Sequence, residues 1–272
     1  MIFNPDRGYD LPFEVDFFGT RYRGNTRNYL DWVVLLYGAY SPSELSALEQ
    51  AARYLRSQGR KVVYLDIGVN VGHHMLFLSR LADELYGFEP NPAVLARARE
   101  KMDLNRIKNA RLFEVALGDR NGTADYFPPQ TVNQGTGSLV DGRGGNSGAS
   151  IPIAIRKADE FLAEQGIAGV GIIKIDVEGF EPAVLRGLRP VIEKDRPFIL
   201  VEISPKGLAE LRGEEGLRSC VYDGAQFFEV TGRNRLAHAL SPYRFEPREC
   251  EVLIVPPEHL AAFQPRAAER GI

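Results

Sequence analysis

The sequence predicts an α/β protein built on an open, mostly parallel β-sheet, and three observations support this fold class. Short apolar runs alternate with segments whose apolar residues recur at helical spacing, which is typical of βαβ units. Four of these runs end in or beside a carboxylate, and the first is followed by a glycine-containing turn. The chain has 272 residues, near the upper limit of what one hydrophobic core serves.

Composition excludes several classes of function. The chain is 44% hydrophobic and 25% charged, and its 33 basic and 36 acidic residues give a net charge of −3. This near-balance argues against nucleic-acid binding as the main task. No apolar run approaches the roughly 20 residues of a membrane span, and residues 1–7 do not resemble a signal peptide. We therefore expect a cytoplasmic enzyme, for which self-association stays open.

The two cysteines, Cys220 and Cys250, lack the spacing of a metal site. Pairing across a hairpin stays open, but reduced buried thiols are favoured in a cytoplasmic chain.

Residues 1–61 are predicted to form an N-terminal extension. The alternation of apolar and polar residues over 13–18 predicts a strand, which ends at a Gly-Thr turn. Residues 31–38 favour either a short helix or a buried strand. A helix is expected from Ser43 to Gly59, because leucine and alanine recur there at helical spacing.

Residues 62–272 are predicted to form the main domain. Continuous apolar runs indicate strands buried on both faces, at 62–67, 85–89, 110–117, 171–176 and 198–203. Helices are expected at 73–81, 91–104, 181–188 and near Leu208, the second opened by Asn91 as N-cap and Pro92 at the first helical position. The runs at 226–231 and 251–255 favour a terminal antiparallel pair.

The alternation is interrupted between about residues 119 and 169 by a glycine-rich insertion. Six glycines fall within residues 135–148. Such a segment is either functional or a passive surface insertion, so a lid in which Ser138 and Leu139 close over a substrate stays one of two interpretations. A strand is expected at 151–155 and a short helix at 159–165.

Carboxylates at the strand ends are the candidate functional residues, because ligands of such sheets bind beyond the carboxyl ends of the strands. The turn from Asp66 to Gly72 lacks the G-x-G-x-x-G spacing of a dinucleotide loop. Asp66 would repel a pyrophosphate and suit a cationic group. Glu89, 21 residues after Gly68, can accept ribose hydroxyls. Together these features describe an adenosine with a cationic tail, which S-adenosylmethionine fits.

Five motifs then resemble one known family: LDIGVNVG at 65–72, GFEPNP at 87–92, ALGD at 116–119, KIDVEGFE at 174–181 and LRG at 185–187. They are similar to those of the FkbM family of S-adenosylmethionine-dependent methyltransferases, and the likeness extends from about Phe13 to Glu202. The resemblance implies a class I methyltransferase fold, a Rossmann-like three-layer sandwich. Its sheet would be mostly parallel and seven-stranded, with an antiparallel C-terminal strand.

The resemblance also implies a cofactor site and an acceptor. Residues implied to bind the cofactor are Asp66, Gly68, Asn70, Gly72, Glu89, Pro90, Glu114, Ala116 and Leu117. The first four would hold the methionine portion, Glu89 the ribose, and residues 114–117 the adenine. The acceptor would be a small molecule or carbohydrate, methylated by default on a hydroxyl group.

The candidate catalytic residues lie at or after strand ends: Lys174, Asp176, Glu178, Glu181 and His74. Asp176 is the main candidate for the general base, because an alcohol must lose its proton to attack, but it could instead orient Lys174 or cap a turn. For Lys174 an ion pair with a neighbouring acid is favoured over a catalytic amine.

Alternatives stay open for the other candidates. Glu178 and Glu181 could face the acceptor or cap the following helix, and His74 or its neighbour His73 could act as the base. Asp176 and Glu202 could share a divalent cation, but no third ligand is evident, so no metal is assigned.

Two other classes of function compete with a methyltransferase. A nicotinamide-dependent oxidoreductase would use a similar sheet, but the missing third glycine and Asp66 disfavour it. A non-catalytic module that binds an adenosine ligand is compatible with the same motifs.

Overall fold

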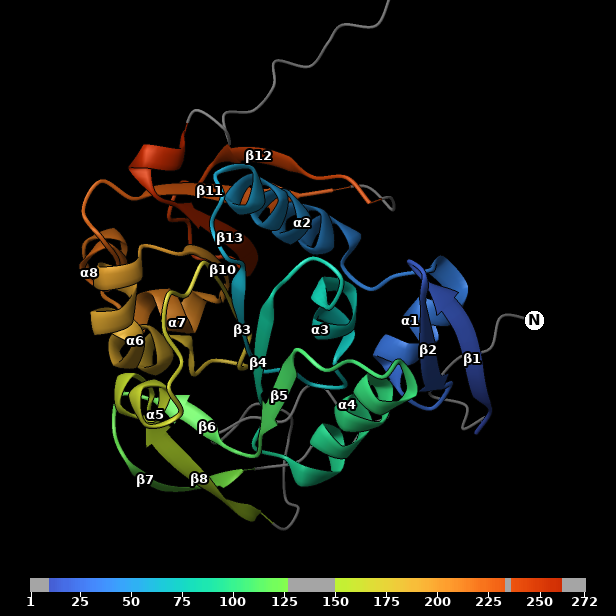
Figure 1. Cartoon of the computed structure of the whole chain (residues 1–272). Helices are drawn as coiled ribbons and strands as arrows, with labels where there is room; N and C mark the ends of the chain where they lie inside the picture. The colour runs from blue at the N-terminus through green and yellow to red at the C-terminus, as the bar shows by residue number, and fades with distance from the viewer. Residues whose placement is uncertain (1–9, 127–149, 233–235, 261–272) are drawn as a thin grey trace, which may run out of the picture.

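The computed structural model describes residues 10–126, 150–232 and 236–260 (Figure 1). The glycine-rich segment, with Ser138 and Leu139, lies outside these residues. The described elements are β1 (Pro12–Phe17), β2 (Thr20–Asn25), α1 (Tyr29–Tyr37), α2 (Pro42–Ser57), β3 (Val63–Ile67), α3 (His73–Leu78), β4 (Glu84–Phe88), α4 (Pro92–Leu104), β5 (Ala110–Phe113), β6 (Ala116–Gly118), β7 (Gly122–Tyr126), β8 (Ile151–Lys157), α5 (Ala158–Glu164), β9 (Ile172–Ile175), α6 (Glu181–Asp195), β10 (Phe198–Ile203), α7 (Pro205–Glu210), α8 (Glu214–Ser219), β11 (Gln226–Thr231), β12 (Ala239–Pro242), β13 (Cys250–Val255) and a 3₁₀ turn (Pro257–His259).

The central sheet has the strand order β12-β11-β13-β10-β9-β3-β4-β5. Strands β10, β9, β3, β4 and β5 are mutually parallel, whereas β13 is antiparallel to both β10 and β11. The predicted fold class and the antiparallel C-terminal strand are therefore confirmed. The sheet has eight described strands rather than seven, because β12 pairs with the outer edge of β11.

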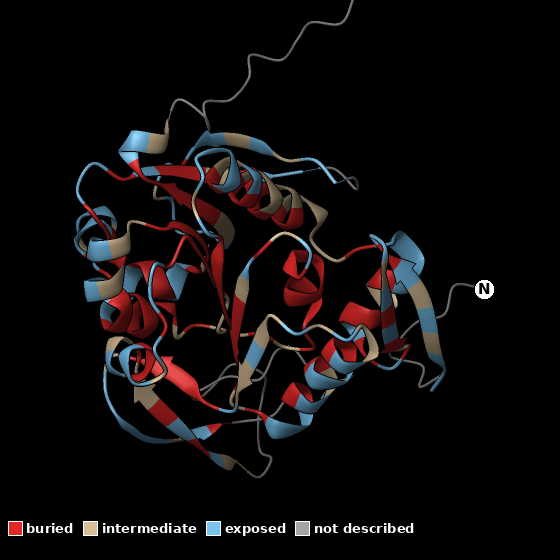
Figure 2. Ribbon diagram, viewed as in Figure 1, coloured by how far each residue is buried: buried red, intermediate tan, exposed pale blue. Residues whose placement is uncertain are grey.

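Helices cover both faces of this sheet and complete three layers (Figure 1). One apolar cluster joins α2, α3 and α4 to one face, and a second joins α5, α6 and α8 to the other. The central strands are buried on both faces (Figure 2), and every residue of β3 and β9 is buried. This double burial explains why the strands are continuous apolar runs in the sequence.

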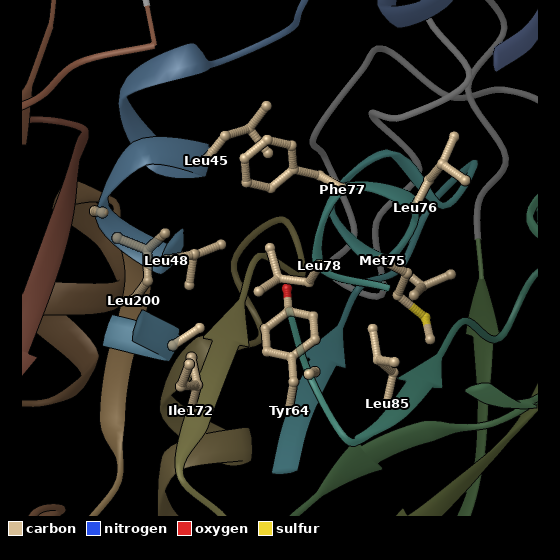
Figure 3. Packing of buried hydrophobic residues seen from close by; sticks show 14 of the residues in the cluster. Leu45, Leu48, Tyr64, Met75, Leu76, Phe77, Leu78, Leu85, Ile172 and Leu200 are labelled. Atoms are coloured by element: carbon tan, nitrogen blue, oxygen red, sulfur yellow. The ribbon is translucent and has the colours of Figure 1, made fainter. Parts of the chain in front are cut away.

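The packing of α2 and α3 against the strands is shown from close by in Figure 3. Leu48 of α2 and Leu78 of α3 belong to the same buried cluster as Tyr64, Ile172 and Leu200, which come from β3, β9 and β10. Burying one such side chain contributes roughly 1.5–3 kcal/mol. Helix α2 therefore covers one face of the central sheet through these apolar contacts.

Two predicted elements differ in the structure. The expected strand 110–117 is two strands, since β5 pairs with β4 in the central sheet while β6 pairs with β8 in a separate three-stranded sheet. A continuous apolar run does not reveal this change of partner. Helix α6 continues past Leu188 to Asp195 despite Pro190, because its apolar face stays buried through Ile192.

Smaller details follow the local sequence. Of residues 31–38, where the sequence favours a helix or a strand, 31–37 lie in α1 and Gly38 is its C-cap; the N-cap Asn28 accepts a hydrogen bond from the amide of Asp31. Cys220 and Cys250 are free thiols. Within the described ranges, no helix is long and apolar enough to cross a membrane.

Candidate active site

A cavity of about 510 Å³ lies at the carboxyl ends of β3, β4, β9 and β10. Its size is within the range of small-molecule sites, and its position is the one expected for the ligand crevice of an open parallel sheet. Residues from α2, α3 and β13 also line it. The cavity therefore brings together segments that are far apart in the chain.

Most of the residues singled out in the sequence line this cavity. They are Gly68, Asn70, His74, Glu89, Pro90, Ala116, Leu117, Lys174, Asp176, Glu178 and Glu202. Four others are not among the lining residues. Asp66 is buried in β3, Gly72 packs against Ala98 of α4, Glu181 is buried at the start of α6, and Glu114 is exposed. The carboxylate of Glu114 lies 4.0 Å from Arg99 at the surface, because the chain leaves the central sheet at this point.

The turn after β3 requires glycine at its first position. Gly68 has φ = 86°, and a Cβ atom there would lie 1.8 Å from the carbonyl oxygen of Asp176. The amides of Gly68 and Val69 donate to the carbonyl oxygen of Phe88. Asn70 also has a positive φ of 51°, and its buried Oδ1 atom has no hydrogen-bond partner among the described residues. The turn is thus held against β4 and β9 with a free acceptor at the cavity.

Glu89 is held rigidly at the end of β4. One carboxylate oxygen accepts the amide of Asn91 at 3.0 Å, and the other accepts the amide of Asn70 at 3.1 Å. Burial nevertheless raises the pKa of Glu89 to about 7. Each oxygen keeps a further lone pair, so the carboxylate can accept two hydroxyl groups from a ligand.

Lys174 and Asp176 form an ion pair at the end of β9, in which the Lys174 side chain is 2% exposed and the Asp176 side chain 35% exposed. The Lys174 ammonium donates to Asp176 Oδ2 at 2.9 Å, as the sequence analysis favoured. Lys174 also lies beside Asp66 in the register of β3 and β9. Burial raises the pKa of Asp66, while the charge of Lys174 opposes that rise.

Glu181 stabilises the loop after β9 rather than facing the cavity. Its Oε1 atom accepts the amides of Val177 and Gly179 at 3.1 and 3.0 Å. These amides belong to the loop and not to α6, whose N-cap Phe180 makes no side-chain cap hydrogen bond. Glu178 lines the cavity with a positive φ of 53°.

The two adjacent histidines face different surroundings. His73 packs among Phe17, Tyr22 and Tyr40, and its Nε2 atom contacts the carbonyl oxygen of Tyr40 at 2.9 Å. Burial lowers the pKa of His73 well below its usual value. The Nε2 atom of His74 instead lies 3.1 Å from Glu44 Oε2.

Sequence reasoning missed two acidic residues of the cavity, Glu44 and Glu251. Glu251 pairs directly with Glu202 in the register of β13 and β10. Burial raises the pKa of Glu202 to about 8, and the charge of Asp176 adds to the rise. The sequence signal that could have identified Glu251 is an acidic residue within the otherwise apolar run 250–255. For Glu44 the neighbouring sequence contains no such signal, because it reaches the cavity only through the packing of α2.

The cavity is poor in groups that would hold a phosphate. Lys174 is the only lysine or arginine among the described residues that line it, and it already pairs with Asp176. The carboxylates fit a cationic nucleoside such as S-adenosylmethionine better than a pyrophosphate. Nowhere in the described part of the chain do three or more His, Cys, Asp or Glu residues form a group that could hold a metal ion.

Comparisons with known proteins agree with this chemistry. Residues 66–223 match the family model described as the methyltransferase FkbM domain. The 2-O-methyltransferase NoeI of Sinorhizobium fredii is 31% identical over 185 residues, which cover 63% of this chain and 74% of NoeI. The hexuronic acid methyltransferase AglP of Haloferax volcanii is 28% identical over 178 residues, 64% of this chain and 66% of AglP. A solved SAM-dependent methyltransferase from Agrobacterium tumefaciens shares the fold, with a TM-score of 0.51 and 10% identity over 93% of this chain and 72% of that chain.

Proposed function

This chain belongs to the FkbM family of S-adenosylmethionine-dependent methyltransferases, and from this premise we propose that it methylates a hydroxyl group of a sugar. NoeI is named a 2-O-methyltransferase and AglP a hexuronic acid methyltransferase, which supports a carbohydrate acceptor. The observation that carries the proposal is the carboxylate-rich half of the cavity, formed by Asp176, Glu178, Glu202 and Glu251. Carboxyl groups accept hydrogen bonds from the several hydroxyl groups of a sugar, whether they are ionised or protonated.

The other half of the cavity would bind the methyl donor. S-adenosylmethionine supplies a methyl group on a positively charged sulfur. Gly68 and Asn70 would contact its methionine portion and Glu89 its ribose hydroxyls. The adenine would lie against the apolar wall that includes Ala116 and Leu117.

The acceptor half would orient the sugar for in-line attack on the methyl carbon. Placing the acceptor oxygen behind that carbon supplies much of the rate. Lys174 keeps its proton, because surrounding carboxylates outweigh burial and raise its pKa. It therefore cannot serve as the base, and we assign it the role of holding the Asp176 carboxylate.

The first test is cofactor binding measured by calorimetry. We expect S-adenosylhomocysteine to bind and NAD not to bind. Glu89→Gln should weaken S-adenosylhomocysteine binding about 10- to 100-fold, because a hydrogen bond to a charged group contributes about 1.5–3 kcal/mol. Glu114→Gln is the matched control at the next strand end and should bind as tightly as the wild type.

The second test is transfer of a labelled methyl group to a panel of sugars and to fractionated cell extract, with mass spectrometry of the product. Methylation of a sugar hydroxyl is the expected result. Methylation confined to non-carbohydrate fractions would overturn the acceptor class. A cytoplasmic location and self-association stay predictions, which cell fractionation and sedimentation can check.

A further inference from the structure

The charged groups that line the cavity are mostly acidic. Six carboxyl side chains contribute to its wall: Glu44, Glu89, Asp176, Glu178, Glu202 and Glu251. Of the lining residues in the described ranges, Lys174 alone is a lysine or arginine, and its ammonium already donates to Asp176 Oδ2 at 2.9 Å. Burial lowers the pKa of His73 well below its usual value, and a proton on His74 would be balanced by Glu44, 3.1 Å away. The described wall therefore offers no unpaired cation to an anionic ligand.

Two acids of the acceptor half face each other across neighbouring strands. Glu202 of β10 and Glu251 of β13 are direct partners in the antiparallel register, and side chains so placed share one face, with Cβ atoms about 4.5–5.5 Å apart. Burial and the charge of Asp176 raise the pKa of Glu202 to about 8. Burial and the charges of Glu44 and Asp176 also raise the pKa of Glu251. At neutral pH both side chains are therefore largely protonated, because this wall does not support further negative charge.

A ligand carboxylate in this half of the cavity would meet the same surroundings. It would lose its hydration beside the charge of Asp176, or it would first have to take up a proton, and either is costly. A protonated glutamate could donate one hydrogen bond to it, but that bond supplies no positive charge. The sulfonium of the methyl donor does not remain to balance it, since sulfur becomes uncharged when the methyl group leaves.

A hydroxyl group meets no such penalty. It is uncharged, and it can donate to a carboxyl oxygen or accept the proton of a protonated carboxyl group. The pair of Glu202 and Glu251 therefore suits the hydroxyl groups of a neutral sugar and opposes an anion in the same place.

We propose that the acceptor is a sugar without an anionic group, and that Glu202 and Glu251 determine this specificity by excluding uronic acids and phosphorylated or sulfated sugars. The proposal rests on the proposed function and narrows it. AglP is named a hexuronic acid methyltransferase, so the two chains would differ in the charge of the acceptor.

Sugars that differ only in charge test the proposal on the wild-type protein. A uronic acid glycoside and its uronamide share one ring and its hydroxyl groups, and the amide is a neutral group of similar size. In whichever sugar series is methylated, kcat/KM for the uronate should be about 100-fold lower than for the uronamide, because each unit by which the surroundings raise a carboxyl pKa is a tenfold penalty on its ionised form. Equal values, or a preference for the uronate, would overturn the proposal.

Glu251→Lys tests the role of this wall. It places a cation beside Glu202, so the uronate should gain about tenfold or more in kcat/KM relative to the uronamide, since an opposite charge nearby favours the ionised form. Glu215→Lys makes the same change of charge at an exposed position of α8 and should keep the wild-type ratio. Binding of S-adenosylhomocysteine as tight as in the wild type would establish that each variant is folded. An unchanged ratio in folded Glu251→Lys would contradict the assignment of specificity to this wall.

The charge of the labelled product from cell extract provides a readout that needs no chosen sugar. After enzymatic cleavage of any glycosidic bonds, the unit that carries the labelled methyl group should pass through an anion-exchange column without retention. Retention of that unit would overturn the proposal while leaving a sugar acceptor intact. An unretained product that is not a sugar would overturn the proposed acceptor class and leave the exclusion of anions standing. No methylation of any sugar or fraction would overturn both.

Discussion

At the scale of single residues, the site depends on one buried cation surrounded by acids. Burial alone would lower the pKa of Lys174, but the charges of Asp176 and Asp66 outweigh it and raise the pKa. A lone charge in this position would be costly, whereas a charge with several hydrogen-bonding partners can be tolerated. Lys174 thereby allows several carboxylates to share one cavity.

The raised pKa of Glu202 should make the folded protein less stable as the pH rises. Its pKa is about 8 in the folded protein against a reference value of 4.5. The folded state therefore binds more protons than the unfolded state between these values, and stability decreases as pH rises through this interval. Glu202→Gln should remove part of this decrease, so that the melting temperature drops less between pH 6 and pH 9 than in the wild type.

Calorimetric melting at several pH values measures this effect. Glu215→Gln, at an exposed position of α8, is the control and should melt as the wild type does at every pH. An equally steep pH dependence in Glu202→Gln and wild type would contradict the assignment.

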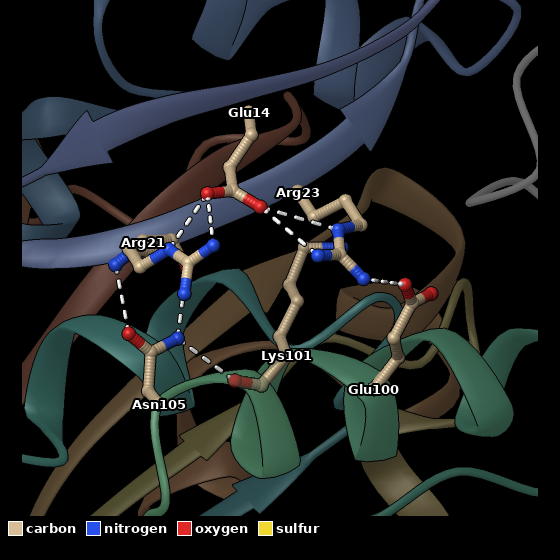
Figure 4. A network of polar contacts seen from close by, with 6 residues as sticks. All are labelled: Glu14, Arg21, Arg23, Glu100, Lys101 and Asn105. Atoms are coloured by element: carbon tan, nitrogen blue, oxygen red, sulfur yellow. Dashed lines mark hydrogen bonds and ion pairs between the residues drawn. The ribbon is translucent and has the colours of Figure 1, made fainter.

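At the scale of elements, the N-terminal hairpin is attached to α4 by two different polar networks. The outer network is shown in Figure 4: Glu14 accepts hydrogen bonds from Arg21 and Arg23, and Arg23 also pairs with Glu100 of α4. The side chain of Asn105 bonds both the amide and the carbonyl oxygen of Arg21. These contacts are exposed, so each contributes little.

The inner network is centred on Asp31, which is 0% exposed. Asp31 accepts the Tyr22 hydroxyl at 2.7 Å and the amide of Asn25 at 2.9 Å, and it pairs with Arg97 of α4. Lys101 lies 3.8 Å away, and burial lowers its pKa to about 8. A single carboxylate therefore connects α1, β2 and α4.

Asp31→Asn should lower the free energy of unfolding by about 3 kcal/mol, because it removes the negative charge that lies 3.8 Å from the buried ammonium of Lys101. Glu14→Gln, which weakens only the outer network, should leave it nearly unchanged, because exposed ion pairs contribute little. Urea unfolding followed by circular dichroism compares the two. Equal effects would mean that the buried network is no more important than the exposed one.

At the scale of the whole molecule, the cavity is assembled from the N-terminal extension as well as from the parallel strands. Tyr40, Ser41 and Glu44 line it together with the ends of β3, β4 and β9. The apolar side of α2 also covers one face of the central sheet. We therefore propose that residues 1–61 fold as part of the methyltransferase domain rather than as an independent unit.

Removal of residues 1–61 should abolish cooperative folding, because it exposes the sheet face that α2 buries. We expect the full chain to melt in a single cooperative transition. A chain that begins at residue 62 should show no cooperative transition and should bind a hydrophobic dye. A shortened chain that melts cooperatively and still binds S-adenosylhomocysteine would contradict this prediction.

Much of the fold and half of the cavity could be predicted from the sequence, because the relevant signals are local. Alternating apolar runs and helical spacing identify the βαβ units, and the carboxyl ends of parallel strands necessarily meet at one edge. Gly68, Glu89 and Asp176 could therefore be placed together. Lys174 and Asp176 are two residues apart in a strand, so their side chains share a face and their ion pair could be expected.

Only the tertiary structure decided the rest, because it depends on long-range packing and register. The packing of α2 on the sheet brings Glu44 to His74, and the antiparallel register of β13 sets Glu251 beside Glu202. The change of sheet between β5 and β6 turns Glu114 to the surface, while Glu181 turns back onto its own loop. Such placements depend on contacts between residues far apart in the chain, which no local pattern records.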